Sequence, residues 1–278
     1  MLAGRAGRDE ECFGWEYLFW EGMFMSCRQF VVDAFADACF KGNPAAVCVL
    51  DDWPEDGWLQ AVAMENNLSE TAFLVREAAG YRLRWFTPKA EVDLCGHATL
   101  ATAHVLYAHL AYVAPKVEFT TRSGVLSVAQ VGAGEYRLDF PARHAQPCAS
   151  SPELMAALGA EPVALLETDV YLAVFADEAQ IVALQPDMAG LLALPRRSVI
   201  ATAPGREVDF VSRYFAPKMG VPEDLVTGSA HCVLTPFWGA RLGKTVLEAR
   251  QLSARGGSLR CEWREPRVGL TGKAVTSS

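Results

Sequence analysis

The chain has 278 residues, of which 51% are hydrophobic and 21% are charged, and its formal net charge is -8 at pH 7. A chain of this length forms roughly two domains and holds enough apolar side chains to fold without disulfides or a structural metal. The apolar content excludes a disordered chain, and the acidic balance argues against a nucleic-acid-binding protein.

The N-terminus and the cysteines bear on cellular location. Residues 1–24 mix acidic and aromatic side chains, so we expect an N-terminal extension outside the fold rather than a signal peptide. No other stretch is apolar enough to span a membrane. The eight cysteines include no Cys-x-x-Cys pair, which argues against a zinc ribbon and a redox motif. We therefore expect reduced thiols and a cytoplasmic protein.

The first half of the chain is predicted to be rich in strands. Alternating apolar residues predict strands over residues 28–35, 45–50, 71–75, 81–86, 116–121, 124–131 and 136–140. The spacing of Leu59, Val62 and Ala63 predicts a helix within residues 58–66. Residues 132–134, Gly-Ala-Gly, lack the third glycine of a nucleotide-binding loop and are expected to form a hairpin turn.

The second half begins after a proline-rich stretch. Prolines near residue 141 place the boundary between an N-terminal lobe, residues 25–140, and a C-terminal lobe, residues 141–278. In the second lobe we expect a helix over 152–158 and strands over 170–175, 198–203 and 209–215. Residues 253–257 are predicted to connect two strands, with Arg255 in a surface salt bridge.

The two halves contain a repeated pattern. Residues 84–89, Arg-Trp-Phe-Thr-Pro-Lys, match residues 213–218, Arg-Tyr-Phe-Ala-Pro-Lys, at four of six positions. Downstream, residues 95–98, Cys-Gly-His-Ala, are echoed by residues 227–230, Thr-Gly-Ser-Ala. In each half a strand is followed by a loop, a glycine turn and a helix, which favours a duplicated fold.

The helices after the two glycine turns define the fold class. Residues 98–110 and 229–242 are apolar on nearly every face, which is typical of helices inside a core. We expect Pro236 to kink or restart the second one. The prediction is an α+β fold with two pseudo-symmetric lobes, each an antiparallel barrel-like sheet wrapped around a central apolar helix. A βαβ fold is disfavoured, because most strands follow one another directly.

The glycine turns are candidate binding sites. A helix N-terminus attracts anions, and Gly96 and Gly228 let a ligand approach the backbone closely. If the lobes are related by a pseudo-twofold axis, the two helix N-termini face each other across a cleft that suits a small anionic substrate. Alternatively, both glycines only form tight turns.

Three side chains near these turns are candidates for proton transfer. Glu70 enters an apolar strand, where a carboxylate must be paired or functional. Asp224 lies four residues before Gly228, where it either caps the turn or points into the cleft. His97 follows Gly96 at a helix start, where the dipole favours the neutral imidazole. It acts there as an acid or base, or is a core histidine bonded to the backbone.

These residues lie in strings that carry a family resemblance. Residues 69–73, Ser-Glu-Thr-Ala-Phe, 95–99, Cys-Gly-His-Ala-Thr, and 227–231, Thr-Gly-Ser-Ala-His, occur in that order. With further matches from about residue 29 to the C-terminus, the sequence resembles the phenazine-biosynthesis PhzF-like family, whose fold is that of diaminopimelate epimerase. Leu225 stands where proline is usual in this family, so the loop is expected to be less rigid.

The resemblance implies a mechanism and a set of partners. In the phenazine enzyme a glutamate at the position of Glu70 shuttles a proton during isomerisation of a dihydro-hydroxyanthranilate. His97 and Asp224 are implied to lie in the same pocket, and Ser69, Gly96, Gly228 and Ser229 to bind the substrate and its carboxylate. The family also implies no cofactor, no metal and a homodimer.

Three alternatives to a one-base isomerase remain open. The first is an epimerase or racemase of an amino-acid-like substrate with Cys95 or His97 as second base. The two-cysteine mechanism of diaminopimelate epimerase is disfavoured, because Thr227 occupies the repeat position of Cys95 and a threonine hydroxyl is a poor base. The second is a catalytically silent ligand-binding protein. The third, a metal-dependent hydrolase, lacks any clustered ligand motif.

Overall fold

The structure of the protein is a computed structural model that describes residues 15–20, 23–78, 80–149 and 151–277. The elements of the first half, in chain order, are β1 (Trp15–Trp20), β2 (Met23–Ala34), β3 (Asn43–Leu50), α1 (Asp56–Asn66), β4 (Glu70–Glu77), β5 (Gly80–Phe86), β6 (Glu91–Val92), α2 (Gly96–His109), β7 (Lys116–Thr121), β8 (Gly124–Gly132) and β9 (Glu135–Pro141). Those of the second half are β10 (Gln146–Pro147), α3 (Pro152–Leu158), β11 (Ala164–Glu167), β12 (Tyr171–Val174), α4 (Glu178–Ala183), α5 (Met188–Ala193), β13 (Val199–Pro204), β14 (Phe210–Ala216), the 3-10 turn η1 (Pro217–Met219), β15 (Val221–Asp224), α6 (Gly228–Leu242), β16 (Val246–Gln251), β17 (Gly257–Arg264) and β18 (Arg267–Thr276). All the predicted helices and strands are present in this mixed α/β fold.

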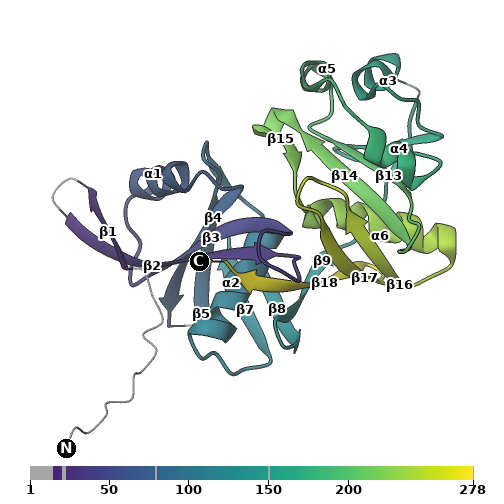
Figure 1. Cartoon of the computed structure of the whole chain (residues 1–278). Helices are drawn as coiled ribbons and strands as arrows, with labels where there is room; N and C mark the ends of the chain where they lie inside the picture. Colours follow the sequence, from purple (N-terminus) through teal and green to yellow (C-terminus); the bar gives the residue numbers. More distant parts are fainter. Residues whose placement is uncertain (1–14, 21–22, 79, 150, 278) are drawn as a thin grey trace, which may run out of the picture.

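Strand pairing follows the same scheme in the two halves. In the first half β2–β3 is antiparallel, β3–β4 parallel, β4–β5 and β5–β6 antiparallel, and β5–β7 parallel. In the second half β11–β12, β12–β13, β13–β14, β14–β15 and β14–β16 repeat this order of antiparallel and parallel pairs. Each series ends in an antiparallel meander, β7–β8–β9 or β16–β17–β18. The repeated hexapeptides are thus parts of a repeated topology (Figure 1).

The last strand, β18, connects the two halves. It pairs with β17, with β9 along residues 135–141, and through residues 274–276 with β2. Figure 1 shows this strand, in yellow, passing from the second half to the side of β2. The C-terminal part of the chain therefore completes the sheet of the N-terminal part.

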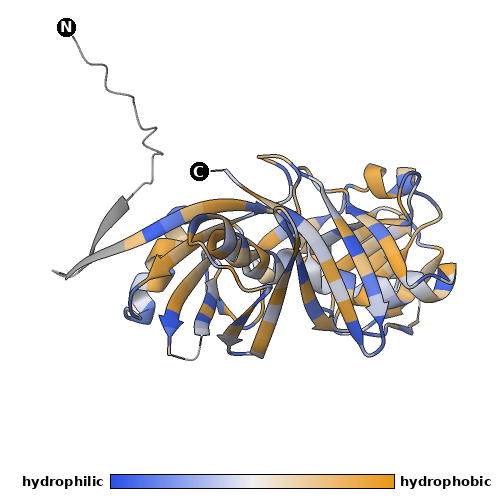
Figure 2. Ribbon diagram, turned by 90° about the horizontal axis from the view of Figure 1, so that it is seen from below, coloured by the Kyte–Doolittle hydropathy of each residue, from blue (hydrophilic) through white to orange (hydrophobic). Residues whose placement is uncertain are grey.

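The two apolar helices are buried, as their composition predicts. Helix α2 packs against β2, β3, β4, β9 and β18, and α6 against β16, β17 and β18. Hydrophobic and hydrophilic residues alternate along many of the surrounding strands (Figure 2), which is typical of sheets with one face on a core. Helix α6 continues through Pro236 as one helix, so the predicted restart does not occur.

The predicted extension, residues 1–24, lies largely outside the described residues, and its role stays a prediction. Within the described part, β1 pairs antiparallel with the first residues of β2. No helix of the described chain is long and apolar enough to cross a membrane.

The prediction for Arg255 was wrong in one respect. The turn between β16 and β17 is present, but Arg255 lies 2.5 Å from Asp33, whose side chain is only 1% exposed. The guanidinium also donates to the carbonyls of Gly42 and Lys41. Since the carboxylate is buried between the halves, this ion pair joins segments 222 residues apart instead of lying on the surface.

Candidate active site

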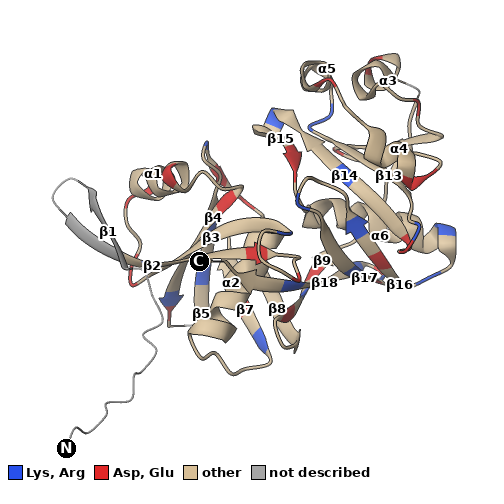
Figure 3. Ribbon diagram, viewed as in Figure 1, with Lys and Arg blue, Asp and Glu red and all other residues tan. Residues whose placement is uncertain are grey.

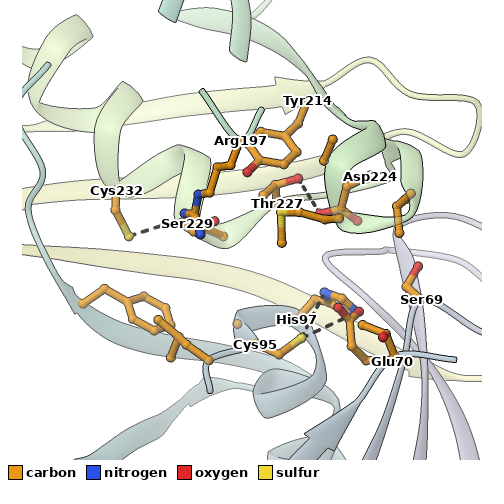
Figure 4. A pocket seen from close by; sticks show the side chains of 18 of the residues that line it. Ser69, Glu70, Cys95, His97, Arg197, Tyr214, Asp224, Thr227, Ser229 and Cys232 are labelled. Atoms are coloured by element: carbon orange, nitrogen blue, oxygen red, sulfur yellow. Dashed lines mark hydrogen bonds and ion pairs between the residues drawn. The ribbon is translucent and has the colours of Figure 1, made fainter. Parts of the chain in front are cut away.

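A cavity of about 180 Å³ lies between segments of the two halves. Its lining includes every residue that the sequence predicted for the site: Ser69, Glu70, Gly96, His97, Asp224, Gly228 and Ser229. Figure 4 shows Glu70, Cys95 and His97 on one wall and Asp224, Thr227 and Ser229 on the other. The acidic side chains come from β4 and from β15, which both carry acidic residues in Figure 3. The structure thus brings the predicted residues together, and their roles stay predictions.

The N-termini of α2 and α6 meet at this cavity. A Cβ atom added to Gly96 would lie 3.7 Å from the Cα of Gly228, and the reverse distance is also 3.7 Å. The N-cap residues, Cys95 and Thr227, make no side-chain capping hydrogen bond. Because the first N–H groups of a helix have no partner within it, both N-termini can donate to an anion in the cavity. The predicted encounter of the two turns is confirmed.

Glu70 and His97 form a close pair on the first wall. The Glu70 Oε2 atom lies 3.0 Å from His97 Nε2, and the side chains are 18% and 5% exposed. This oxygen is buried and makes no well-aligned hydrogen bond with any described residue. The carboxylate is therefore held at ion-pair distance while its hydrogen-bonding capacity toward the cavity is unused.

The pKa of His97 differs from the expectation based on the helix dipole. Burial lowers the pKa, but the nearby Cys95 and Glu70 raise it, and the net result lies well above 6.5. Burial and Glu70 raise the pKa of Cys95 to about 11, so the thiol is uncharged at neutral pH. The direction of this pKa shift is opposite to the one predicted from the helix dipole, because Cys95 and Glu70 both lie close to the imidazole and the prediction considered neither of them.

Asn43 connects this pair to Asp224 on the opposite wall. Its Nδ2 atom donates to Asp224 Oδ1 at 2.7 Å and lies 3.2 Å from His97 Nδ1. Thr227 Oγ1 donates to Asp224 Oδ2 at 2.5 Å. Burial raises the pKa of Asp224, and Glu70 adds to this, whereas His97 and the two donors lower it; the net pKa is raised. Asn43 was missed as a site residue, although the Gly-Asn-Pro turn that contains it was a visible signal.

Three further cavity residues, Arg143, Arg197 and Tyr214, were also missed. Both arginines lie in loops, after β9 and before β13, where neither periodicity nor a motif marks them. Tyr214 belongs to the repeated hexapeptide, but it was assigned only to a strand. Its hydroxyl accepts a hydrogen bond from Ser198 Oγ at 2.7 Å.

One group of cavity residues has the donor types of a metal site. Ligand atoms of Glu70, Cys95 and His97 lie within 4.8 Å of one another. Transition metals bind the thiolate form of cysteine, and the raised pKa of Cys95 disfavours that form. Metal binding at this group would require the Cys95 thiol to lose its proton, and the expectation of no metal stays a prediction.

The chain is similar to known proteins over most of its length. The PhzC-PhzF family, described as phenazine biosynthesis-like protein, matches residues 32–278. An uncharacterized isomerase of Pseudomonas aeruginosa is 56% identical over 251 residues, which are 90% of this chain and 96% of that protein. The crystal structure of a PhzF-family protein from Enterococcus faecalis has a TM-score of 0.88 at 47% identity, over 90% of this chain and 96% of that one.

A more distant structure shares the fold alone. A hydroxyproline epimerase from Agrobacterium vitis matches with a TM-score of 0.59 at 12% identity, over 90% of each chain. The match of the family over nearly the whole chain and the high identity of the relatives decide the assignment. The chain belongs to the phenazine biosynthesis-like (PhzC-PhzF) family, and it is an isomerase.

Proposed function

We propose that the protein is a cofactor-independent isomerase of a small carboxylate-bearing substrate, with Glu70 as the group that moves the proton. The observation that carries the proposal is the Glu70 carboxylate, whose buried Oε2 atom lies 3.0 Å from His97 Nε2 in the cavity. The repeated strand pairing supports the two-lobed, duplicated form of the fold. The family resemblance supports a homodimer and a reaction without a metal.

The proposed reaction is a proton shift within one molecule. The substrate carboxylate binds the free N–H groups beside Gly96 and Gly228. Glu70 takes a proton from a C–H bond, whose electron pair forms a new double bond as the neighbouring double bond shifts. The protonated Glu70 then returns the proton to another carbon, so the enzyme ends unchanged. The helix N–H groups stabilise the negative charge that develops.

The two groups beside Glu70 have complementary tasks. The raised pKa of His97 favours a protonated imidazole, whose Nε2 atom lies 3.0 Å from the Glu70 carboxylate. On the opposite wall Asp224 is fixed by hydrogen bonds from Asn43 and Thr227, so its carboxyl group is held where it can hydrogen-bond to the substrate.

An epimerase is the second candidate, because two thiols line the cavity. Cys95 and Cys232 are both lining residues. Burial raises their pKa values, to about 11 and about 12 respectively, so neither thiol is a ready base at neutral pH. The isomerase with Glu70 as its single base is therefore the better supported function.

The test is hydrogen exchange measured by NMR in deuterated water. Purified protein is mixed with a panel of cyclic dienyl carboxylates and amino acids. We expect Glu70→Gln to lower the exchange rate by about 10²- to 10⁴-fold, the usual contribution of a general base, and to leave ligand binding intact. Glu77→Gln, at the exposed end of the same strand, is the matched control and should exchange as the wild type does.

Each other outcome identifies a different function. Exchange that persists in Glu70→Gln contradicts the proposal. Exchange at a stereocentre that is lost in Cys95→Ser indicates the epimerase. Binding without exchange in the wild type indicates a ligand-binding protein.

A further inference from the structure

Two arginines in the cavity wall share a single carboxylate. Arg197 Nε lies 2.7 Å from Asp169 Oδ2, and an Arg143 guanidinium nitrogen contacts Asp169 Oδ1. No other ion pair involves either arginine among the described residues. Within this group of three side chains two positive charges are balanced by one negative charge, which leaves the group with one net positive charge.

Pro236 explains how the backbone of Arg143 is held at this wall. A proline has no N–H group, so the carbonyl four residues earlier, that of Cys232, loses its helical partner. The N–H of Arg143 donates to this carbonyl at 3.0 Å. The interior proline of α6 therefore creates the attachment point for the loop that carries one of the two guanidinium groups.

The repeated topology assigns Arg197 to a functional position. The strand registers of the two halves pair equivalent residues, Thr71 with Phe86 and Val199 with Phe215. The two phenylalanines occupy the same place in the repeated hexapeptide, so Ser198 corresponds to Glu70. In the same way, Arg197 corresponds to Ser69. The segment that leads into this strand thus carries the proton-transfer group, Glu70, in the first half and a cation, Arg197, in the second.

The neighbours of Arg197 also suit an anion. In Figure 4 its side chain runs toward Ser229 at the N-terminus of α6, with the ring of Tyr214 beside it. The Tyr214 hydroxyl accepts from Ser198, which leaves its own proton available for a ligand. The wall opposite Glu70 and His97 therefore carries two guanidinium groups and hydrogen-bond donors, together with the carboxyl group of Asp224.

We propose that Arg143 and Arg197 bind a second carboxylate of the substrate, so that the substrate class is a small dicarboxylate. The inference rests on the proposed function, since it gives the first carboxylate to the helix N-termini. A guanidinium group presents two parallel donors that match a carboxylate, and Asp169 holds both groups without neutralising both. The second carboxylate orients the molecule so that its reacting carbons lie toward Glu70.

The test compares matched monocarboxylates and dicarboxylates as binding probes. Affinities are measured by calorimetry for three pairs: crotonate and fumarate, butyrate and glutarate, and benzoate and isophthalate. In at least one pair we expect the dicarboxylate to bind the wild type about tenfold more tightly, as one charge-assisted hydrogen bond provides. Arg197→Gln should remove this preference and change the affinity for the monocarboxylate by less than about twofold.

Two variants separate this role from a structural one. Arg197→Lys keeps the charge but not the paired donors, so it should retain part of the preference. Arg196→Gln is the matched control, because Arg196 is the adjacent residue, pairs with Glu167 at 2.7 Å, and does not line the cavity. It should bind every probe as the wild type does.

The inference is overturned if no pair shows a preference for the dicarboxylate, or if Arg197→Gln weakens both members of a pair equally. Its failure is distinguishable from that of the proposed function, because binding is measured without turnover. Glu70→Gln should keep the preference for dicarboxylates. If the wild type shows no preference for dicarboxylates but its exchange depends on Glu70, only this inference fails. If the preference is present but exchange is independent of Glu70, only the proposed function fails.

Discussion

The two helix N-termini that meet in the cavity have similar backbones and different side chains. Gly96 and Gly228 occupy equivalent positions and are in contact. Around Gly96 the side chains are those of Cys95 and His97, with Glu70 nearby, whereas Gly228 is flanked by Thr227 and Ser229. Both halves have kept the anion-binding backbone, but the side chains around it have diverged. Those near Gly96 suit proton transfer, and those near Gly228 suit binding.

The two halves also share an ion pair before the helix start, between the arginine of the hexapeptide and a glutamate. Arg84 makes a two-point contact with Glu91, at 2.8 and 2.7 Å, and Arg213 makes one with Glu223, at 2.7 and 2.8 Å. Each arginine also lies over the ring of a phenylalanine in its own hexapeptide. The difference is that Glu91 has a second partner, Arg122, at 2.7 Å.

Removing these arginines should reveal the largest difference in stability between the two halves. Arg213→Ala leaves the partly buried Glu223 without a cation and removes the hydrogen bonds to the carbonyls of Ile181 and Leu184, and we expect a loss of about 2 to 4 kcal/mol in the free energy of unfolding. Arg84→Ala leaves Glu91 paired with Arg122, so a loss of about 1 to 3 kcal/mol is expected. Urea unfolding measures both, with the exposed Arg82→Ala as control at about 0.5 kcal/mol or less. Equal losses for the two variants would show that Arg122 does not compensate.

The histidines of the two helices should respond to pH in opposite directions. Burial lowers the pKa of His231 to about 4, so its contribution to stability is present above pH 6.5 and is lost as the pH falls through 4. The lost contribution is about 3 kcal/mol. His97, with its raised pKa, contributes below pH 6.5 and loses that contribution as the pH rises through its folded-state pKa.

Unfolding free energies measured from pH 4 to pH 10 test this contrast. His231→Gln should flatten the acid side of the profile and His97→Gln the alkaline side. Burial also lowers the pKa of His104 to about 4. This histidine is present in both variants, so it contributes equally to the acid side of both stability profiles. A variant that flattens the wrong side would refute the assigned protonation state.

The thiols should show the smallest effect. Since the pKa of Cys95 is about 11, only about one thiol in a thousand is ionised at pH 8. Cys95→Ser and Cys232→Ser should each lower exchange by far less than the roughly hundredfold loss caused by removing a general base. Slow alkylation by iodoacetamide would agree with this, and loss of exchange in both variants would favour the epimerase.

Much of the fold could be predicted, because the apolar composition of α2 and α6 indicates that both helices are buried. The all-round apolar helices, the glycine turns and the repeated hexapeptides led to a two-part fold with a site between related helix ends. The elements that were not predicted include β6, β10, β11, α4, α5, β15 and β18, whereas β16 and β17 were predicted only as two strands joined by residues 253–257. Their positions depend on partners far away in sequence, as when β18 pairs with β2.

Every residue that the sequence predicted for the site lines the cavity, but the chemistry of the site was predicted only in part. Asn43 connects the two walls only after β3 has been placed beside the loop that follows β15, and no local pattern reports that contact. The pKa of His97 is raised by Cys95 and by Glu70, and the second of these lies 27 positions earlier in the sequence, where no local pattern connects it to the histidine. Arg143 and Arg197 were missed because loops bring them together through Asp169.

The path of β18 also constrains the order of folding. Ser277 donates to the carbonyl of Val31, 246 residues away along the chain, and the strand before it closes the sheet around α2. During synthesis the first half can therefore form its local hairpins early, but its sheet stays open at β2 until the final strand has left the ribosome. Contacts of such long sequence separation slow folding, and an open strand edge invites pairing with other chains. The nascent protein thus depends on β18 to protect the edge of β2 from aggregation.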